Sequence, residues 1–249
     1  MIYKFFALSL ICFCLVGCEK SSQNEGLKPI TVILSPDNPP YEFKDTDQGN
    51  GQVLGFDVDI IKELGKRLGR PIEIIEADFG AIIPSLQSGR ADIAISELNP
   101  TEERKKSVDF SNPYYVDKSS FLVLESSTLT SEKDLAGQKL GVQLGTTNEA
   151  SAKEWAKNIP NLTIVTLGKL GELVQELKNG RIQAILNAEK GCQNIAHATS
   201  GLKVVSTDIK GRELSVAFPK GSPLVGPVND ALKQMTDVIQ TFENKWIKS

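Results

Sequence analysis

The sequence predicts an α/β fold made of two lobes, each a mostly parallel sheet with helices on both faces. Short apolar runs rich in β-branched residues alternate with longer amphipathic stretches, a pattern typical of buried parallel strands joined by helices. The alternation occurs twice, first over residues 30–115 and again over residues 137–207. Because each repeat can build its own sheet, we expect two units connected by two chain crossings that form a hinge.

Six short apolar runs are expected to form the buried strands. They are residues 30–34, 72–75, 92–95, 140–142, 162–165 and 184–186. Residues 119–124 are also apolar, and we expect an extended passage between the two lobes there. A further strand within residues 214–221 starts no third repeat, so the chain is expected to return to the first lobe.

The amphipathic stretches between the strands predict helices. Residues 56–68 place four apolar side chains on one helical face, and residues 168–178 have the same periodicity. Gly69 and Gly180 stand where a glycine commonly ends a helix. After the last strand we expect one long helix that ends near Trp246.

These elements give the expected division of the chain. Residues 29–115 together with residues 215–249 should form lobe 1, and residues 116–214 should form lobe 2, including the hinge segments. Residues 18–28 are polar and aperiodic, as expected of a flexible tether that precedes the folded body.

The N-terminus is typical of an export signal. Lys4 supplies a positive charge, and residues 5–16 form an apolar run that is too short to span a bilayer as a helix. The four residues that end at Cys18 (LVGC) match a lipobox, so residues 1–17 are expected to be a lipoprotein signal peptide and Cys18 the lipidated first residue of the mature chain. The alternative is an ordinary secretory signal followed by a chance cysteine.

Composition excludes several classes of site. The chain has a formal net charge of −3 and no basic patch, so we expect no nucleic-acid partner. Without the signal peptide, only Cys18 and Cys192 remain, and a lipidated Cys18 leaves Cys192 without a disulfide partner. His197 is the only histidine in the sequence. A disulfide framework, a histidine triad and a multi-histidine zinc site are therefore not expected, and neither is a cofactor or a metal.

Loops that follow the expected strands should face a cleft between the lobes, because ligands bind beyond the carboxyl ends of strands in open α/β sheets. In the loop over residues 96–104, Asn99 suits a helix N-cap and Pro100 the first helical position, so free backbone N–H groups would face the cleft. Arg104 lies one turn further, where its planar guanidinium can bind a carboxylate through two hydrogen bonds. The alternative for Arg104 is a surface ion pair with a neighbouring glutamate.

Motifs along nearly the whole mature chain occur in the order of a known family. They are residues 39–43 (PPYEF), 55–60 (GFDVDI), 83–90 (IPSLQSGR), 100–104 (PTEER), 108–111 (VDFS), 113–115 (PYY), 145–147 (GTT) and 217–221 (AFPKG). This ordered set resembles the solute-binding proteins of polar amino acid ABC importers, which have the two-lobed type II periplasmic binding protein fold. Asp57 and Asp59 within these motifs are interpreted as solvated charges at a helix start.

The resemblance implies a role for the residues of the cleft. Arg104 resembles the clamp of the ligand's α-carboxylate, which is assisted by Thr147 and by backbone N–H groups around Glu97. Phe79 resembles the aromatic wall over the ligand's side chain, with a core-filling role as the alternative. The resemblance also implies ligand contacts from Ser35, Asn38, Ser96 and Gln143. Gln143 would contact the far end of the ligand. The alternative is that Gln143 lies at a strand end and faces solvent.

Three departures from the family pattern concern the ligand's α-ammonium. Asn99 stands where the family commonly has serine or threonine, and Ala188 stands where it has an aspartate. Glu97 replaces a small residue, and a buried carboxylate without a cationic partner is costly. We therefore expect Glu97 to supply the missing charge to the α-ammonium or to a cationic side chain, with Asn187 and Glu189 as weaker candidates. If Glu97 instead points to water, ordinary amino acids should bind poorly.

The expected function is capture of a polar amino acid and its delivery to an ABC permease, without enzymatic activity. Glu97 favours a cationic ligand such as arginine, and glutamine or another polar amino acid is the alternative. We expect a monomer that is lipid-anchored to a membrane and faces the periplasm or the cell exterior. The alternatives from other classes are an exported dehydratase that uses Glu97 or Glu189, and the sensor domain of a receptor.

Overall fold

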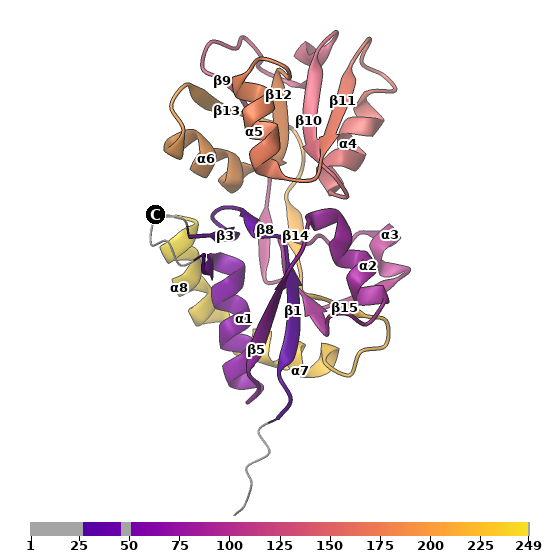
Figure 1. Cartoon of the computed structure of the whole chain (residues 1–249), viewed down its shortest axis with the longest axis vertical. Coiled ribbons are helices and arrows are strands. Elements are labelled where there is room, and N and C mark those ends of the chain that lie inside the picture. The colour runs from indigo at the N-terminus through magenta and orange to yellow at the C-terminus, as the bar shows by residue number, and fades with distance from the viewer. Residues whose placement is uncertain (1–26, 46–50, 249) are drawn as a thin grey trace, which may run out of the picture.

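The computed structural model describes residues 27–45 and 51–248. The expected signal peptide, the lipidation site Cys18 and most of the expected tether lie outside these residues. The described chain forms two lobes, one above the other in Figure 1, joined by a narrow two-stranded ribbon. Among the described residues, no helix is both long and apolar enough to cross a membrane.

The lower lobe in Figure 1 is built on a five-stranded sheet in the order β5-β1-β6-β15-β7. Its strands are β1 (Ile30–Leu34), β5 (Ile72–Glu76), β6 (Ile93–Ala94), β7 (Val108–Phe110) and β15 (Ala217–Pro219). β1 pairs in parallel with β5 and β6, and β15 runs antiparallel to both of its neighbours. The late strand β15 therefore lies in the middle of the early strands, as the absence of a third repeat indicates.

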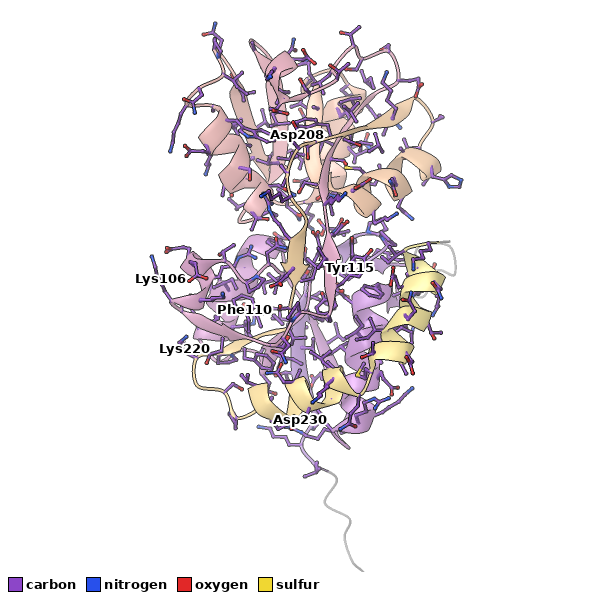
Figure 2. The ribbon with its side chains drawn as sticks, turned by 180° about the vertical axis from the view of Figure 1, so that it is seen from behind. Lys106, Phe110, Tyr115, Asp208, Lys220 and Asp230 are labelled. Carbon is purple, nitrogen blue, oxygen red and sulfur yellow. The ribbon has the colours of Figure 1, made fainter. Side chains whose placement is uncertain are left out.

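Helices and a small sheet complete the lower lobe. The helices are α1 (Phe56–Arg67), α2 (Ile82–Gln87), α3 (Glu102–Lys105), α7 (Val225–Lys233) and α8 (Thr236–Trp246), with a short 3-10 turn η1 (Phe79–Ala81). The small antiparallel sheet contains β2 (Asp37–Asn38), β3 (Glu42–Lys44) and β4 (Val53–Leu54). In Figure 2, which views the chain from behind, Asp230 of α7 lies at the base of this lobe.

The upper lobe has its own five-stranded sheet in the order β11-β10-β12-β9-β13. Its strands are β9 (Ser119–Leu124), β10 (Lys139–Gln143), β11 (Thr163–Leu167), β12 (Ala184–Ala188) and β13 (Leu202–Ser206). Helices α4 (Thr147–Trp155), α5 (Leu170–Lys178) and α6 (Glu189–Ala198) cover it, and a 3-10 turn η2 (Glu132–Leu135) precedes β10. β9 is antiparallel to both neighbours, so each sheet is mostly parallel with one antiparallel strand.

The two lobes are joined by β8 (Tyr115–Asp117) and β14 (Arg212–Leu214), which pair antiparallel. Tyr115 is labelled on this ribbon in Figure 2, below Asp208 of the upper lobe. These are the two chain crossings that the sequence predicts.

Local sequence explains why α1 forms and where it ends. Its apolar residues Phe56, Ile60, Ile61 and Leu64 are fully buried against the first sheet, each contributing about 1.5–3 kcal/mol of burial free energy. Gly69, just beyond the helix, has φ 64°, a left-handed conformation that a residue with a Cβ rarely adopts. The expected helix and its glycine stop are thus confirmed.

Two sequence expectations are wrong, and one strand was not predicted. Residues 119–124 are the buried strand β9 and not a passage between lobes, because their side chains pack on both faces of the second sheet. β13 was not predicted, because its sequence (LKVVS) mixes polar and apolar residues and only Leu202 is buried. The tail contains two helices and not one, because the buried Met235 turns the chain so that both α7 and α8 pack against α1.

Candidate functional site

A small cavity of about 10 Å³ lies between the lobes and is lined by residues of both. The first lobe contributes Asp37, Asn38, Glu42, Phe79, Glu97 and Asn99. The second lobe contributes Gln143, Thr146, Thr147, Asn148 and Asn187. Most of the lining side chains lie at or just beyond the carboxyl ends of β1, β5, β6, β10 and β12, which is where ligands bind in open α/β sheets. Seven of the expected ligand-binding residues line it: Asn38, Phe79, Glu97, Asn99, Gln143, Thr147 and Asn187.

Arg104 lies at the edge of this cavity. Its guanidinium stands 5.6 Å from the centre of the Phe79 ring, and it donates to the backbone oxygens of Asn99 and Gly145, both at 3.0 Å. Burial lowers the Arg104 pKa to about 10, an effect that Glu97 opposes and Arg212 reinforces. No described carboxylate forms an ion pair with Arg104, so its charge remains available to a ligand.

The alternative of a surface ion pair for Arg104 is not what the structure shows. The neighbouring Glu102 and Glu103 pair instead with Lys105 at 2.9 Å and with Lys106 at 2.6 Å. The expected N-cap is also wrong, since α3 begins at Glu102 and Thr101 caps it by accepting from the Arg104 N–H at 3.2 Å. Asn99 cannot serve as the cap because its side chain is engaged elsewhere, with the Glu213 carbonyl and the Thr147 hydroxyl.

Glu97 is held in an uncommon conformation at the cavity. Its φ is 47°, in the left-handed region that favours glycine. Its N–H donates to Asp57 Oδ2 at 2.7 Å, and its Oε2 accepts from Asn38 Nδ2 at 2.8 Å. Burial, together with the charges of Asp117 and Asp57, raises the Glu97 pKa well above its usual value. The carboxylate forms no ion pair with a described residue, and a cation in the cavity would stabilise its charged form.

A second group of buried carboxyls lies beneath Glu97. Glu42 and Asp57 are 1% and 0% exposed, and the Ser96 hydroxyl donates to Glu42 Oε1 at 3.0 Å. Glu42 Oε2 has no hydrogen-bond donor among the described groups unless one of the two carboxyls carries a proton. Burial raises the pKa of both, while their mutual hydrogen bond raises that of Glu42 and lowers that of Asp57. The pair therefore favours a proton on Glu42 over one on Asp57, and Asp57 fixes the Glu97 backbone through the Glu97 N–H.

Sequence reasoning misjudged Asp57. It was expected to be a solvated charge, yet it is fully buried and also accepts from the Tyr114 hydroxyl at 2.9 Å. The signal was present, because Asp57 lies three and four residues before Ile60 and Ile61 and so shares their buried helical face. Asp59 is also paired, with Lys245 at 2.7 Å and with the Trp246 indole at 2.7 Å.

Side chains of the second lobe reach across the cavity to the first. Gln143 donates to Asp37 Oδ2 at 3.0 Å, and Thr147 donates to Asn99 Oδ1 at 2.8 Å. Gln143 is only 5% exposed, so its alternative as a solvent-facing strand end is wrong. These contacts hold the two lobes together around the cavity.

Two residues that the sequence did not single out also contribute. Asp37 additionally accepts from the Leu170 N–H at 2.9 Å, at the start of α5. Arg212, on the connecting strand β14, donates to Thr147 at 2.8 Å and to Asn148 at 3.1 Å. Neither position carries a local signal, because each acquires its role from a partner more than 60 residues away.

Four expected ligand-binding residues are not among those that line the cavity: Arg104, which lies at its edge, and Ser35, Ser96 and Glu189. The Ser35 hydroxyl donates to Asp37 at 2.9 Å, and its N–H donates to the Ser96 hydroxyl at 3.0 Å. Both serines therefore support the cavity loops from behind. Glu189 begins α6 and accepts from Gln193 at 3.2 Å, away from the cavity lining.

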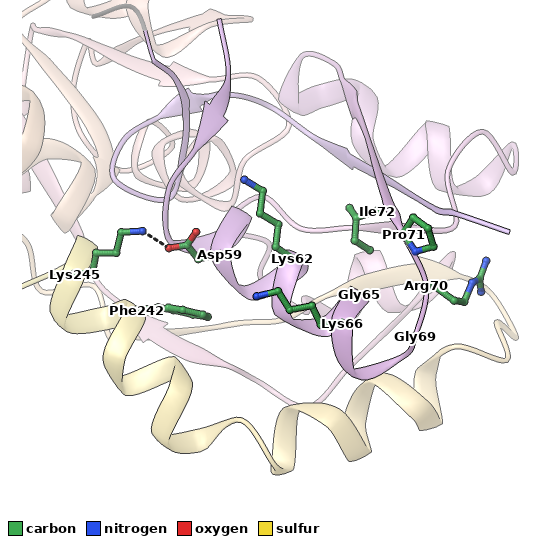
Figure 3. Close-up of a pocket in the computed structure, with 10 residues that line it drawn as sticks. All are labelled: Asp59, Lys62, Gly65, Lys66, Gly69, Arg70, Pro71, Ile72, Phe242 and Lys245. Carbon is green, nitrogen blue, oxygen red and sulfur yellow. Dashed lines mark hydrogen bonds and ion pairs between the residues drawn. The ribbon is translucent and has the colours of Figure 1, made fainter. Parts of the chain in front are cut away.

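A larger hollow lies elsewhere, in the groove between α1 and α8 of the lower lobe (Figure 3). Its lining includes four basic side chains together with Phe242 and Ile72, and its one acid, Asp59, is already paired with Lys245. It lies on one lobe only and brings no unpaired acid together with an unpaired base. The cavity between the lobes is therefore the better candidate for binding a zwitterion.

The part of the chain that the structure describes contains no group of three or more acidic, histidine or cysteine side chains that could hold a metal ion. Cys192 is buried, its thiol donates to the Ser120 carbonyl at 3.5 Å, and burial raises its pKa. It therefore acts as a small apolar side chain.

The buried carboxyls make a pH-dependent contribution to stability. Because burial raises the Asp57 pKa to about 6, its contribution is fully present below its unfolded pKa of 3.8 and is lost as the pH rises through 6. At about 1.4 kcal/mol per pKa unit, the loss is on the order of 3 kcal/mol. We expect the unfolding free energy of the native protein, relative to that of Asp57→Asn, to fall between pH 4 and pH 7 in urea titrations without ligand. A difference in unfolding free energy between the two proteins that does not change with pH would contradict this prediction.

Comparison with known proteins agrees with this geometry. Residues 30–249 match the family model described as bacterial extracellular solute-binding proteins, family 3. The chain is 34% identical over 243 residues to the arginine-binding extracellular protein ArtP of Bacillus subtilis, covering 95% of this chain and 93% of that protein. An ancestral arginine-binding protein bound to arginine has a similar structure, with a TM-score of 0.83 and 35% identity over 88% of this chain and 97% of that one. The same is true of an ancestral arginine-binding protein bound to glutamine, with a TM-score of 0.83 and 34% identity over 89% and 98%.

Proposed function

The chain belongs to the bacterial extracellular solute-binding proteins of family 3, and on that premise we propose that it captures a cationic amino acid, with arginine favoured, in the cavity between its lobes. One observation carries the choice of ligand. At the edge of the cavity, Arg104 forms no ion pair with a described carboxylate, and within the cavity the buried Glu97 forms none with a described basic group. A small zwitterion supplies the opposite charge to each.

In the proposed complex, Arg104 binds the ligand's α-carboxylate and Phe79 covers its aliphatic stem. Glu97 receives the cationic side chain or the α-ammonium, and Asn38, Asn99, Gln143, Thr147 and Asn187 complete the polar wall. A micromolar dissociation constant corresponds to about 8 kcal/mol. A few charge-assisted hydrogen bonds, each contributing about 1.5–3 kcal/mol, supply this after ordering costs.

Binding is proposed to follow hinge closure about the β8–β14 ribbon. An open form admits the ligand to one lobe, and the second lobe then adds its contacts. The closed form would be recognised by an ABC permease, to which a lipid anchor at Cys18 would keep the protein close. Binding in this arrangement requires no bond to be made or broken, so we propose binding without turnover. The alternative is an exported dehydratase. A time course of ligand concentration tests it, because only an enzyme would consume the ligand.

Thermal-shift screening of the full-length protein against the twenty amino acids tests the ligand class. At about 100 times its dissociation constant, a ligand that binds only the folded state adds about 2.7 kcal/mol to the unfolding free energy. We expect the unfolding midpoint to rise with L-arginine, less with lysine and glutamine, and not with aspartate or glutamate. A rise with the acidic amino acids alone would overturn the assignment of Glu97 and leave the family membership intact.

A further inference from the structure

The cavity contains a chain of hydrogen bonds that runs from Glu97 to the opposite lobe. Asn38 Nδ2 donates to Glu97 Oε2 at 2.8 Å, which leaves the Asn38 amide oxygen as an acceptor. That oxygen accepts from Asn187 Nδ2 of the second lobe at 3.2 Å. Asn38 and Asn187 are 6% and 5% exposed, so neither amide has much access to water.

Ionisation of Glu97 would fix the direction of this chain, because a protonated Glu97 could present either its carbonyl oxygen or its hydroxyl to Asn38. A carboxylate only accepts hydrogen bonds, so it turns the nitrogen of Asn38 towards itself and the oxygen towards Asn187. If Asn38 were reversed, its nitrogen would face the nitrogen of Asn187 and the contact between the lobes would be lost. Asn187 is therefore matched to an ionised Glu97, although it touches Glu97 only through Asn38.

The backbone of the second lobe is shaped for the same contact. Gly191, on the first turn of α6, packs over the two amides, and a Cβ there would lie 2.8 Å from both Asn187 Nδ2 and Asn38 Oδ1. Its φ is not in the left-handed region, so backbone conformation does not require glycine at this position. Close approach of the two lobes does require it.

We propose that Asn38 and Asn187 form a clasp that couples closure of the lobes to the ionised state of Glu97, and that both are positioning residues for a cationic ligand. The proposal deepens the proposed function and rests on it. A cation bound to Glu97 favours the ionised carboxylate, which orients Asn38, and Asn38 then holds the second lobe closed through Asn187. The same interactions thus recognise the ligand's charge and slow the ligand's release.

The first test is the rate of L-arginine dissociation from the full-length protein, followed by stopped-flow fluorescence. Asn187→Ala and Gly191→Ala should each release arginine about tenfold faster and leave the association rate within about twofold, because most effects of such contacts appear in dissociation. The matched controls are Asn194→Ala, an exposed asparagine on the same helix, and Gly171→Ala, where a Cβ meets no atom within 4 Å. Unchanged dissociation in both clasp variants would overturn the proposal.

The second test is a double-mutant cycle between Glu97→Gln and Asn187→Ala, with the L-arginine dissociation constant as the readout. If the clasp reads the charge of Glu97, the roughly tenfold cost of Asn187→Ala should shrink to less than about threefold in the Glu97→Gln background. Additive costs would reject the coupling and leave Asn187 as an ordinary wall residue. Failure of the unmodified protein to bind arginine in the same titrations would instead reject the proposed function.

Discussion

Arg104→Ala is expected to abolish measurable binding of L-arginine, raising its dissociation constant more than about 100-fold. Removing one partner of a desolvated, hydrogen-bonded charge pair costs about 3–5 kcal/mol, because the other charge is left without its counterpart. The guanidinium is also fixed in place by the Asn99 and Gly145 carbonyls and by the Phe79 ring, so little entropy is lost when a carboxylate binds. Isothermal titration calorimetry gives the change directly.

Two further variants test whether the loss of affinity comes from the paired N–H donors of the guanidinium. Arg104→Lys keeps the charge but loses the planar pair of N–H groups, so its affinity should lie between those of the native protein and of Arg104→Ala. Lys105→Ala, next in sequence and paired only with the exposed Glu102, should bind normally. Native-like affinity in Arg104→Ala, with an unchanged unfolding midpoint, would remove Arg104 from the site.

Elements that depend only on neighbouring residues could be predicted from the sequence, both in type and in position. The apolar period of α1 and its glycine stop needed only neighbouring residues, and both are present. The position of β9 could not be predicted in the same way. Its place in the sheet depends on pairing with β12 and β13, more than 50 residues later, and an apolar run looks alike whether it crosses between lobes or lies within one.

The site shows the same division between local and distant information. Asn38, Glu97 and Gln143 could be located because each lies at or just beyond the end of an apolar strand. Arg212 and Asp37 could not, because their roles come from α4 and from the start of α5 across the cavity. Asn99 was misassigned for a related reason, since its side chain bonds to β14 and to Thr147 and leaves the helix cap to Thr101.

Glu97→Gly is expected to weaken binding of L-arginine about 100-fold without destabilising the fold. Glycine adopts the observed φ of 47° more readily than glutamate, which relieves about 1 kcal/mol of backbone strain. It also removes a buried carboxylate whose charged form is disfavoured by its surroundings. Affinity and unfolding midpoint should therefore change in opposite directions, a result that a merely structural role for Glu97 would not produce.

Moving the acid to the other lobe should recover much of that loss. Ala188 is 1% exposed, ends β12 and precedes the first residue of α6, a position where the family that the sequence resembles has an aspartate and where an aspartate also suits a helix N-cap. In Glu97→Gly/Ala188→Asp we expect arginine to bind within about tenfold of the native affinity, since each charge of the ligand again meets its opposite. Isothermal titration calorimetry on the single and double variants measures the dissociation constants that test this. Recovery would show that the cavity needs one carboxylate near the ligand's cation and accepts it from either lobe, whereas no recovery would mean that Glu97 acts through its particular contact with Asn38.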